Sequence, residues 1–257
     1  MEKKWKIKLV LLLTILGAIG IIAIIPYQMT TLMSDQALPI DTPIALVITV
    51  NSLAQVLQIF ILVLIGVRLQ KRTGLSAPIL EGIVYDKKIP VISKKWMLIG
   101  VLVSFIGSLI ILLLDLFVFN PYIQLPEEQT PETVWWQGLL AMFYGGITEE
   151  LMLRLFGMTL VVWILARITK KEKGTIPDSF FYIAIFLTAI LFGLGHLPAT
   201  AQVFGELSTI IVVRAIVLNG LLGLWFGYLY WKKGLEYAMV AHMSADVFIH
   251  VLFVSIF

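Results

Sequence analysis

Residues 135–166 read WWQGLLAMFYGGITEELMLRLFGMTLVVWILA, an apolar stretch interrupted near its middle by charged side chains. A bilayer core about 30 Å thick needs roughly 20 apolar residues in a helix, so this stretch is longer than one straight span. The pair Gly145-Gly146 stands just before the charges, where glycine permits a kink. Charged groups at membrane depth need surroundings made of protein, which predicts a broken or strongly tilted helix that faces the interior of a bundle.

Further apolar stretches lie on both sides of this one. Hydrophobic residues make up 60% of the chain and charged residues 14%, whereas soluble domains carry roughly 25% charged residues. Candidate spans lie near residues 9–25, 43–67, 97–119, 135–166, 180–197, 209–230 and 235–256. The sequence therefore predicts an all-α, polytopic transmembrane helix bundle of about seven spans, with eight possible, in a single membrane domain covering residues 1–257.

Charged residues between the stretches alternate in sign along the whole chain, beginning with the lysines before the first span. By the positive-inside rule, this predicts a multi-pass protein of the cell membrane with a cytoplasmic N-terminus and a C-terminus outside. The basic loop 68–95 contains an apolar patch, residues 74–81, which predicts a short interfacial helix on the inner membrane surface. Basic clusters placed this way indicate topology, so no nucleic-acid partner is expected. The absence of cysteine excludes thiol catalysis.

Three charged residues stand in the middle of the 135–166 stretch. Glu150 precedes Arg154 by four positions, so the two side chains lie one above the other on a helix and are expected to form an ion pair. Glu149 lies about 100° around the helix and is free to point elsewhere. An alternative is that all three charges mark a helix end in the headgroup zone, but a further apolar run, 155–165, follows them.

Two later spans also carry polar residues at helical spacing. Phe192 and His196 share a face near the end of one span, and His242, Asp246 and His250 line one stripe of the last. Each group has a simpler interpretation: His196 as an interfacial residue, or Asp246 as a partner of a neighbouring histidine that holds helices together. Ionisable groups are costly inside a bilayer, so the groups taken together favour one functional site.

Carboxylates and imidazoles on three helices provide what amide hydrolysis requires. These are a base for water, donors for the oxyanion and an acid for the leaving amine. We expect Glu149, His196, His242 and Asp246 to converge in one cavity that opens towards the cytoplasmic half of the membrane, with Glu149 as the base. The same four residues would be the ligands if the enzyme used zinc. No cofactor is required if they hold water directly, which we favour because no pair of histidines has the four-residue spacing of helical zinc proteases.

The predicted depth of His196 in the membrane conflicts with that of Glu149 and His242. The predicted topology puts Glu149 and His242 in the inner half. His196 comes late in a span that starts inside, so a straight helix would place it nearer the outer face. A tilted fifth helix, or a span count that is wrong by one, would remove the conflict.

Other polar residues in the spans are interpreted as structural. Asn51, Gln55 and Gln58 fall on one helix face, and Asn219 belongs to a small-residue face with Gly220, Gly223 and Gly227. Both faces are typical of helix packing. Asp115 and Arg214 lie near the outer ends of their spans, where they could reach the interface.

In these residues the sequence resembles the CPBP or Abi family of CAAX-processing and bacteriocin-processing intramembrane endopeptidases. The family pattern is Glu-Glu-x-x-x-Arg, then Phe-x-x-x-His, then His-x-x-x-Asn or Asp. Here the three motifs stand in order as Glu149, Glu150 and Arg154, then Phe192 and His196, then His242 and Asp246. The resemblance covers roughly residues 135–250, and an ordered set on helices is more specific than any single motif.

The resemblance implies an endopeptidase that cuts a membrane-associated protein or a small peptide, with the first glutamate activating water and the histidines and Asp246 completing the site. Its partners would be the lipid bilayer and a peptide or membrane-anchored substrate, such as a prenylated protein, a bacteriocin or a signalling peptide; oligomeric state is left open. Prenyl-protein enzymes commonly carry asparagine where this chain has Asp246, which leaves the substrate class open. Two alternatives remain: a non-catalytic immunity or scaffold protein of the same fold, and a proton-coupled transporter.

Overall fold

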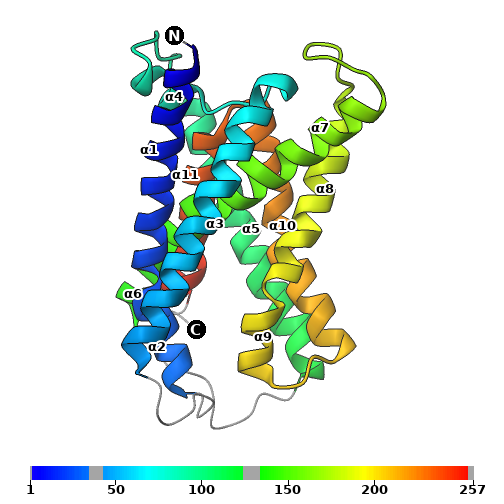
Figure 1. The fold of residues 1–257 in the computed structure, drawn as a ribbon. Coiled ribbons are helices and arrows are strands. Elements are labelled where there is room, and N and C mark those ends of the chain that lie inside the picture. Colours follow the sequence, from blue (N-terminus) through cyan, green and yellow to red (C-terminus); the bar gives the residue numbers. More distant parts are fainter. Residues whose placement is uncertain (1, 35–42, 124–133, 254–257) are drawn as a thin grey trace.

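The computed structural model describes residues 2–34, 43–123 and 134–253, and this part of the chain is helical without strands. Its helices are α1 (Glu2–Ala23), α2 (Ile25–Ser34), α3 (Ile44–Thr73), α4 (Pro78–Val84), α5 (Lys94–Leu114), η1 (Asp115–Phe119), η2 (Asn120–Tyr122), α6 (Trp135–Phe143), η3 (Tyr144–Glu149), η4 (Leu151–Met158), α7 (Thr159–Ile168), α8 (Asp178–Gly195), α9 (Leu197–Phe204), α10 (Thr209–Lys232), α11 (Leu235–Val247) and η5 (Phe248–Phe253). They pack side by side as one bundle (Figure 1).

Within the described residues, 6 helical segments are long and apolar enough to cross a membrane. They are Ile7–Thr30, Ile44–Thr73, Lys94–Tyr122, Trp135–Ile168, Asp178–Phe204 and Thr209–Lys232. Helices α11 and η5 are continuous with each other and correspond to the last predicted span. The protein is therefore a multi-pass, all-helical membrane protein, as predicted, and about seven spans agree with its helices.

The two ends of the bundle differ sharply in charge. The end where α1 begins, which we call the basic end, also holds the end of α3, the loop around α4, the α7–α8 turn and the α10–α11 turn (Figure 1). All 19 Lys and Arg residues except Arg154 and Arg214 belong to these segments. The opposite end holds α2, the start of α3, α9 and the end of η5. The alternation of charge in the sequence thus becomes a difference between two faces of one molecule.

The short helix predicted in the loop between the second and third spans is present as α4. It is fastened to the start of α11, because the Glu236 carboxylate accepts a hydrogen bond from the Leu80 amide at 2.7 Å. The Leu235 amide donates to the Ser76 carbonyl at 3.1 Å. These two bonds fix the height at which α11, and with it His242, begins.

The long fourth stretch is one continuous helical segment. It starts as α6, widens into π-helical turns in η3 and η4, and continues as α7. The predicted break at Gly145-Gly146 is wrong, whereas the alternative of a strong tilt is correct: the segment crosses the bundle obliquely, from α6 near the opposite end to α7 at the basic end (Figure 1). Wide π-turns are frequent at functional sites, and here they surround Glu149 and Glu150.

The glycine pair serves close packing instead of a kink. A Cβ on Gly145 would collide with the Asp246 carboxylate and lie 3.2 Å from His242 Nε2. A Cβ on Gly146 would collide with the side chain of Met243, which lies on α11 together with His242 and Asp246. Helix η3 therefore runs directly against α11, and this contact brings Glu149 beside His242 and Asp246.

A buried apolar core fills the bundle on the basic side of this contact. Leu13, Val63, Leu155, Leu229 and Leu235 come from α1, α3, η4, α10 and α11, and all are inaccessible to solvent. Large apolar side chains also cover the outside of the bundle, as expected where helices face lipid. The polar residues of the fourth stretch are thus enclosed by protein.

We predict that Gly193→Ala lowers the thermal stability of the detergent-solubilised protein. A Cβ at Gly193 would collide with the Ile216 backbone and lie 3.0 Å from the Ala215 carbonyl oxygen, so α8 and α10 would be forced apart. Overpacking of this kind costs about 1–3 kcal/mol. Gly195→Ala is the matched control, because a Cβ there meets nothing within 4 Å. Equal melting temperatures for the two variants would contradict the packing assignment.

Candidate active site

The site is built on the expected ion pair between Glu150 and Arg154. Their nearest charged atoms, Oε1 and Nη1, lie 3.3 Å apart, and both side chains are 0% exposed. Arg154 Nη2 also donates to the Gly223 carbonyl of α10 at 3.0 Å. The alternative in which these charges mark a helix end in the headgroup zone is therefore wrong, since the pair lies inside the bundle.

Two aromatic rings enclose the pair from the sides. Arg154 lies 5.5 Å from the ring centres of Phe192 and of Phe226, which is within the range of cation–π attraction. Phe192 also meets the rings of His196 and His242 edge-on at 4.8 and 5.5 Å. Phe226 stacks on His242 at 4.4 Å. The motif phenylalanine thus acts as a wall that holds both imidazoles and the guanidinium group in place.

Glu150 fixes the orientation of His242. The imidazole Nδ1 lies 2.8 Å from Glu150 Oε1, and because a carboxylate accepts hydrogen bonds, Nδ1 carries the hydrogen. The other nitrogen, Nε2, then faces the cavity. It lies 3.7 Å from Glu149 Oε2 and 3.7 Å from Asp246 Oδ1.

His196 is oriented in the same way by a backbone group. Its Nδ1 lies 2.8 Å from the Phe192 carbonyl oxygen, which can only accept, so Nδ1 is again the donor. Its Nε2 faces Glu149 Oε1 at 4.0 Å. The conflict over the depth of His196 is thereby resolved: the oblique fourth segment brings Glu149 to the level at which α8 ends.

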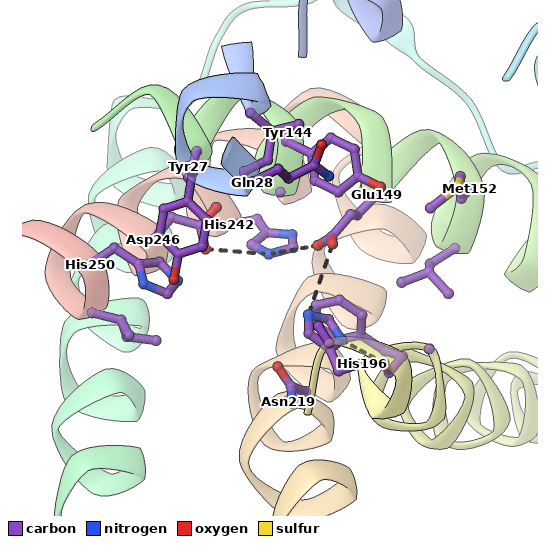
Figure 2. Close-up of a pocket in the computed structure, with 18 of the residues that line it drawn as sticks. Tyr27, Gln28, Tyr144, Glu149, Met152, His196, Asn219, His242, Asp246 and His250 are labelled. Carbon is purple, nitrogen blue, oxygen red and sulfur yellow. Dashed lines mark hydrogen bonds and ion pairs between the residues drawn. The ribbon is translucent and has the colours of Figure 1, made fainter. Parts of the chain in front are cut away.

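Side chains from η3, the end of α8 and α11 therefore converge on one point, as Figure 2 shows for Glu149, His196, His242 and Asp246. The separations of 3.7 to 4.0 Å are too long for direct hydrogen bonds. They are distances that one bridging water spans. The arrangement can hold a water molecule between a carboxylate and two imidazole nitrogens.

These groups line a cavity of about 730 Å³. Its wall continues from the site to the end of α1, the start of α3, α9 and the start of α10, all in the half of the bundle opposite the basic end. From the sequence we expected the cavity to open towards the cytoplasmic half and the basic loops to be cytoplasmic, whereas the wall residues lie in the half of the bundle away from the basic loops. The two expectations do not hold together, because the tilt of the fourth segment, which sets the level of Glu149, does not follow from the sequence.

Several wall residues were interpreted from the sequence as structural. Asn51, Gln55 and Asn219 line the cavity instead of serving only helix packing, whereas Gln58 is exposed on the outside of α3. Amide side chains spaced four residues apart, as Asn51 and Gln55 are, were the signal that could have indicated a polar wall.

Asp115 and Arg214 also line the cavity, where they form an ion pair that sequence reasoning missed. Arg214 Nε and Nη2 each lie 2.6 Å from a carboxylate oxygen of Asp115. The pair joins η1 to α10, which are 99 residues apart in the chain, and so could not be inferred from local spacing. His250 lines the cavity near Asp246, with its ring edge-on to Tyr27 at 5.9 Å.

The same residues were considered as zinc ligands. Among the described residues, no group of three or more His, Asp or Glu is arranged to hold a metal ion. The Nε2 atoms of both histidines point at Glu149, at 4.0 and 3.7 Å from its carboxylate oxygens. The separations of these donor atoms are close to those of ligands around one metal ion as well as to those spanned by one water, so metal dependence is put to a test under the proposed function.

Fold and site together define a class: a multi-pass helical membrane protein with a buried carboxylate and two oriented imidazoles at the inner end of a cavity. The family model described as Type II CAAX prenyl endopeptidase Rce1-like matches residues 131–248, which include every motif residue above. This part of the chain is therefore similar to that family of intramembrane endopeptidases, which confirms the resemblance seen in the sequence. No curated protein and no solved structure matches the chain.

We predict that Arg154→Ala lowers the yield of folded protein as well as any activity. Removing the guanidinium group leaves Glu150 charged and buried without its partner, and breaking a buried pair costs about 3–5 kcal/mol. Glu149→Gln should keep the yield of the parent, because Glu149 borders the cavity and keeps its shape as an amide. Yield is measured as the monodisperse fraction in detergent. If both variants fold as well as the parent, the ion pair is not what holds the site.

Proposed function

We propose that the protein hydrolyses a peptide bond of a membrane-associated protein or small peptide, using a water molecule activated by Glu149. The observation that supports this most directly is the position of the Glu149 carboxylate, which faces Nε2 of both His196 and His242 at distances that one water bridges. The family match supports the class of reaction. Mechanism and substrate are our inference from the geometry.

In the proposed reaction, Glu149 takes a proton from the water as its oxygen attacks the carbonyl carbon of the peptide bond. A C–O bond forms, and the carbonyl electron pair moves onto oxygen. When the tetrahedral intermediate collapses, the C–N bond breaks and Glu149 gives the proton to the leaving nitrogen. The carboxylate is thereby regenerated, and the products are a carboxyl group and an amine.

The two imidazoles stabilise the oxyanion in this scheme. Each ring already donates its Nδ1 hydrogen, to Glu150 or to the Phe192 carbonyl, so Nε2 carries a hydrogen in the protonated ring. An imidazolium Nε2–H aimed at the cavity is a preorganised donor for a developing negative charge. Glu150 and Arg154 are positioning residues, because they act through His242 and do not face the cavity themselves.

Asp246 lies on the far side of His242 from His196 and faces the same Nε2 atom. In this position an ionised Asp246 would attract the positive charge of an imidazolium ring that donates to the oxyanion. We propose this electrostatic role for Asp246. Proton transfer is proposed for Glu149, which lies between the two histidines (Figure 2).

We predict that Glu149→Gln lowers the cleavage rate by at least about a hundredfold, because an amide cannot accept the water's proton. The rate is measured in proteoliposomes as the appearance of new termini in a mixed-sequence peptide pool, read by mass spectrometry. Glu206→Gln, an exposed carboxylate between α9 and α10, is the matched control and should cleave like the parent. A Glu149→Gln protein that cleaves at the parent's rate would remove Glu149 from the mechanism.

We also predict that exhaustive chelation leaves the cleavage rate unchanged, because in the proposed reaction Glu149 activates the water without a metal ion. The purified protein is dialysed against chelator, assayed on the same peptide pool, and assayed again after zinc is added back. Loss of cleavage that zinc restores would show instead that Glu149, His196, His242 and Asp246 rearrange around a metal.

A further inference from the structure

A layer of bonded side chains lies between the catalytic cavity and the basic end. Tyr230 of α10 is 1% exposed, and its hydroxyl is bonded to Gln70 of α3 and Thr159 of α7, each at 2.8 Å. Leu155 and Leu229 pack around this polar layer without exposure to solvent. The cavity wall continues from the catalytic residues in the other direction, along α10, so a peptide held at the site lies against that part of the wall.

An arginine that the proposed reaction does not use stands in this part of the wall. Of the described residues that line the cavity, Arg214 is the only lysine or arginine, and its side chain is 21% exposed. Arg154, by contrast, is fully buried in its pair with Glu150. An anionic group that enters the cavity therefore meets one permanent positive charge among these residues, that of Arg214.

Asp115 occupies only part of the Arg214 guanidinium group. The two carboxylate oxygens accept hydrogen bonds from Nε and Nη2, each at 2.6 Å. The group has further N–H donors, and no described residue accepts from Nη1. The ring of Phe204, at the end of α9, lies 5.2 Å from the guanidinium carbon and supports it from the side. Arg214 is thus held in one orientation with donors left for a second carboxylate.

The packing of α8 against α10 brings Arg214 close to the catalytic residues. The two helices are antiparallel, and Gly193 of α8 lies against the Ile216 backbone of α10. His196 follows Gly193 by three residues. Arg214 precedes Ile216 by two, so it starts at almost the same level as His196. Neighbouring helix axes lie about 8–10 Å apart and an extended peptide advances about 3.3 Å per residue, so a few residues of substrate reach from one side chain to the other.

We propose that Arg214, held by Asp115, is a subsite for a substrate carboxylate that lies a few residues from the bond being cut. The proposal rests on the proposed hydrolysis and adds a requirement of the substrate, a negative charge at a fixed distance from that bond. The carboxylate is either the free C-terminus or an acidic side chain, since both present the same two oxygens. Arg214 binds it through Nη1 while Nε stays on Asp115, so one guanidinium group joins two carboxylates.

The test compares mixed-sequence peptide libraries without Asp or Glu that differ only at the C-terminus, which is a free carboxylate in one and an amide in the other. A third library is amidated and carries a single Glu. The Glu149→Gln protein in proteoliposomes is incubated with an equal mixture, and retained peptides are counted by mass spectrometry after subtraction of retention by protein-free liposomes. We expect at least about tenfold higher retention of one or both carboxylate libraries than of the plain amides, as for one charge-assisted hydrogen bond. The library that is retained identifies the source of the carboxylate.

Two variants in this background separate binding from packing. Arg214→Gln removes the cation and should abolish the preference for carboxylates. Asp115→Asn breaks the same ion pair but keeps the cation, so the preference should persist or increase. If the pair only joined η1 to α10, both variants would lower the melting temperature and neither would change the retention ratio. Arg167→Gln, an exposed arginine at the basic end, is the matched control and should retain peptides like its parent.

Equal retention of all three libraries, or a carboxylate preference that survives the loss of Arg214, would overturn the proposal. If Arg214→Gln does not fold, the double variant Asp115→Asn/Arg214→Gln, which leaves neither charge unpaired, takes its place and is compared with Asp115→Asn. Retention requires no catalysis, and cleavage of the same libraries is measured separately with Glu149 intact. A carboxylate preference without cleavage would reject the proposed hydrolysis and leave the subsite standing, whereas cleavage without the preference would reject the subsite alone.

Discussion

Glu150 and Arg154 form an ion pair in a place where neither side chain reaches solvent. Taking two charges out of water is costly, and their attraction offsets that cost only when further hydrogen bonds complete the arrangement. Here the further partners are His242 on the carboxylate side, and the Gly223 carbonyl with two aromatic faces on the guanidinium side. These partners come from α8, α10 and α11, so the pair joins three helices to the fourth segment. The direction in which His242 presents Nε2 follows from this requirement.

Close backbone approach supplies the second condition for the site. A carboxylate and an imidazole on different helices lie within one water of each other only if the helices nearly touch. Gly145 and Gly146 permit this between η3 and α11, and Gly193 permits it between α8 and α10. In lipid, where helices gain nothing from excluding water, such small residues are what allow packing at short range. These glycines therefore act by allowing short distances between helices in the site, and not by making the backbone flexible.

The sequence predicted the helices, the ion pair and the set of residues that converge, because each follows from local spacing or from the cost of a charge in a bilayer. It did not predict how the helices tilt. Periodicity indicates which face of a helix is polar but not the level at which that face meets its neighbours. The depth of His196 and the half of the bundle that holds the cavity therefore did not follow from the sequence. Contacts between distant segments were missed for the same reason. The Asp115–Arg214 pair and the stacking of Phe226 on His242 have no signature in either segment alone.

The layer formed by Tyr230, Thr159 and Gln70 has a consequence for the energetics of the membrane. A polar cavity that reaches the middle of a bilayer could act as a leak for protons or ions if it continued to the other face. Here it ends at side chains that are bonded to one another and surrounded by leucine, so this layer separates the cavity from the basic end. Water at the Glu149 carboxylate then exchanges with a single compartment. In the proposed hydrolysis, bond cleavage would then move no charge between compartments, so it would not dissipate the ion gradients of an energised membrane.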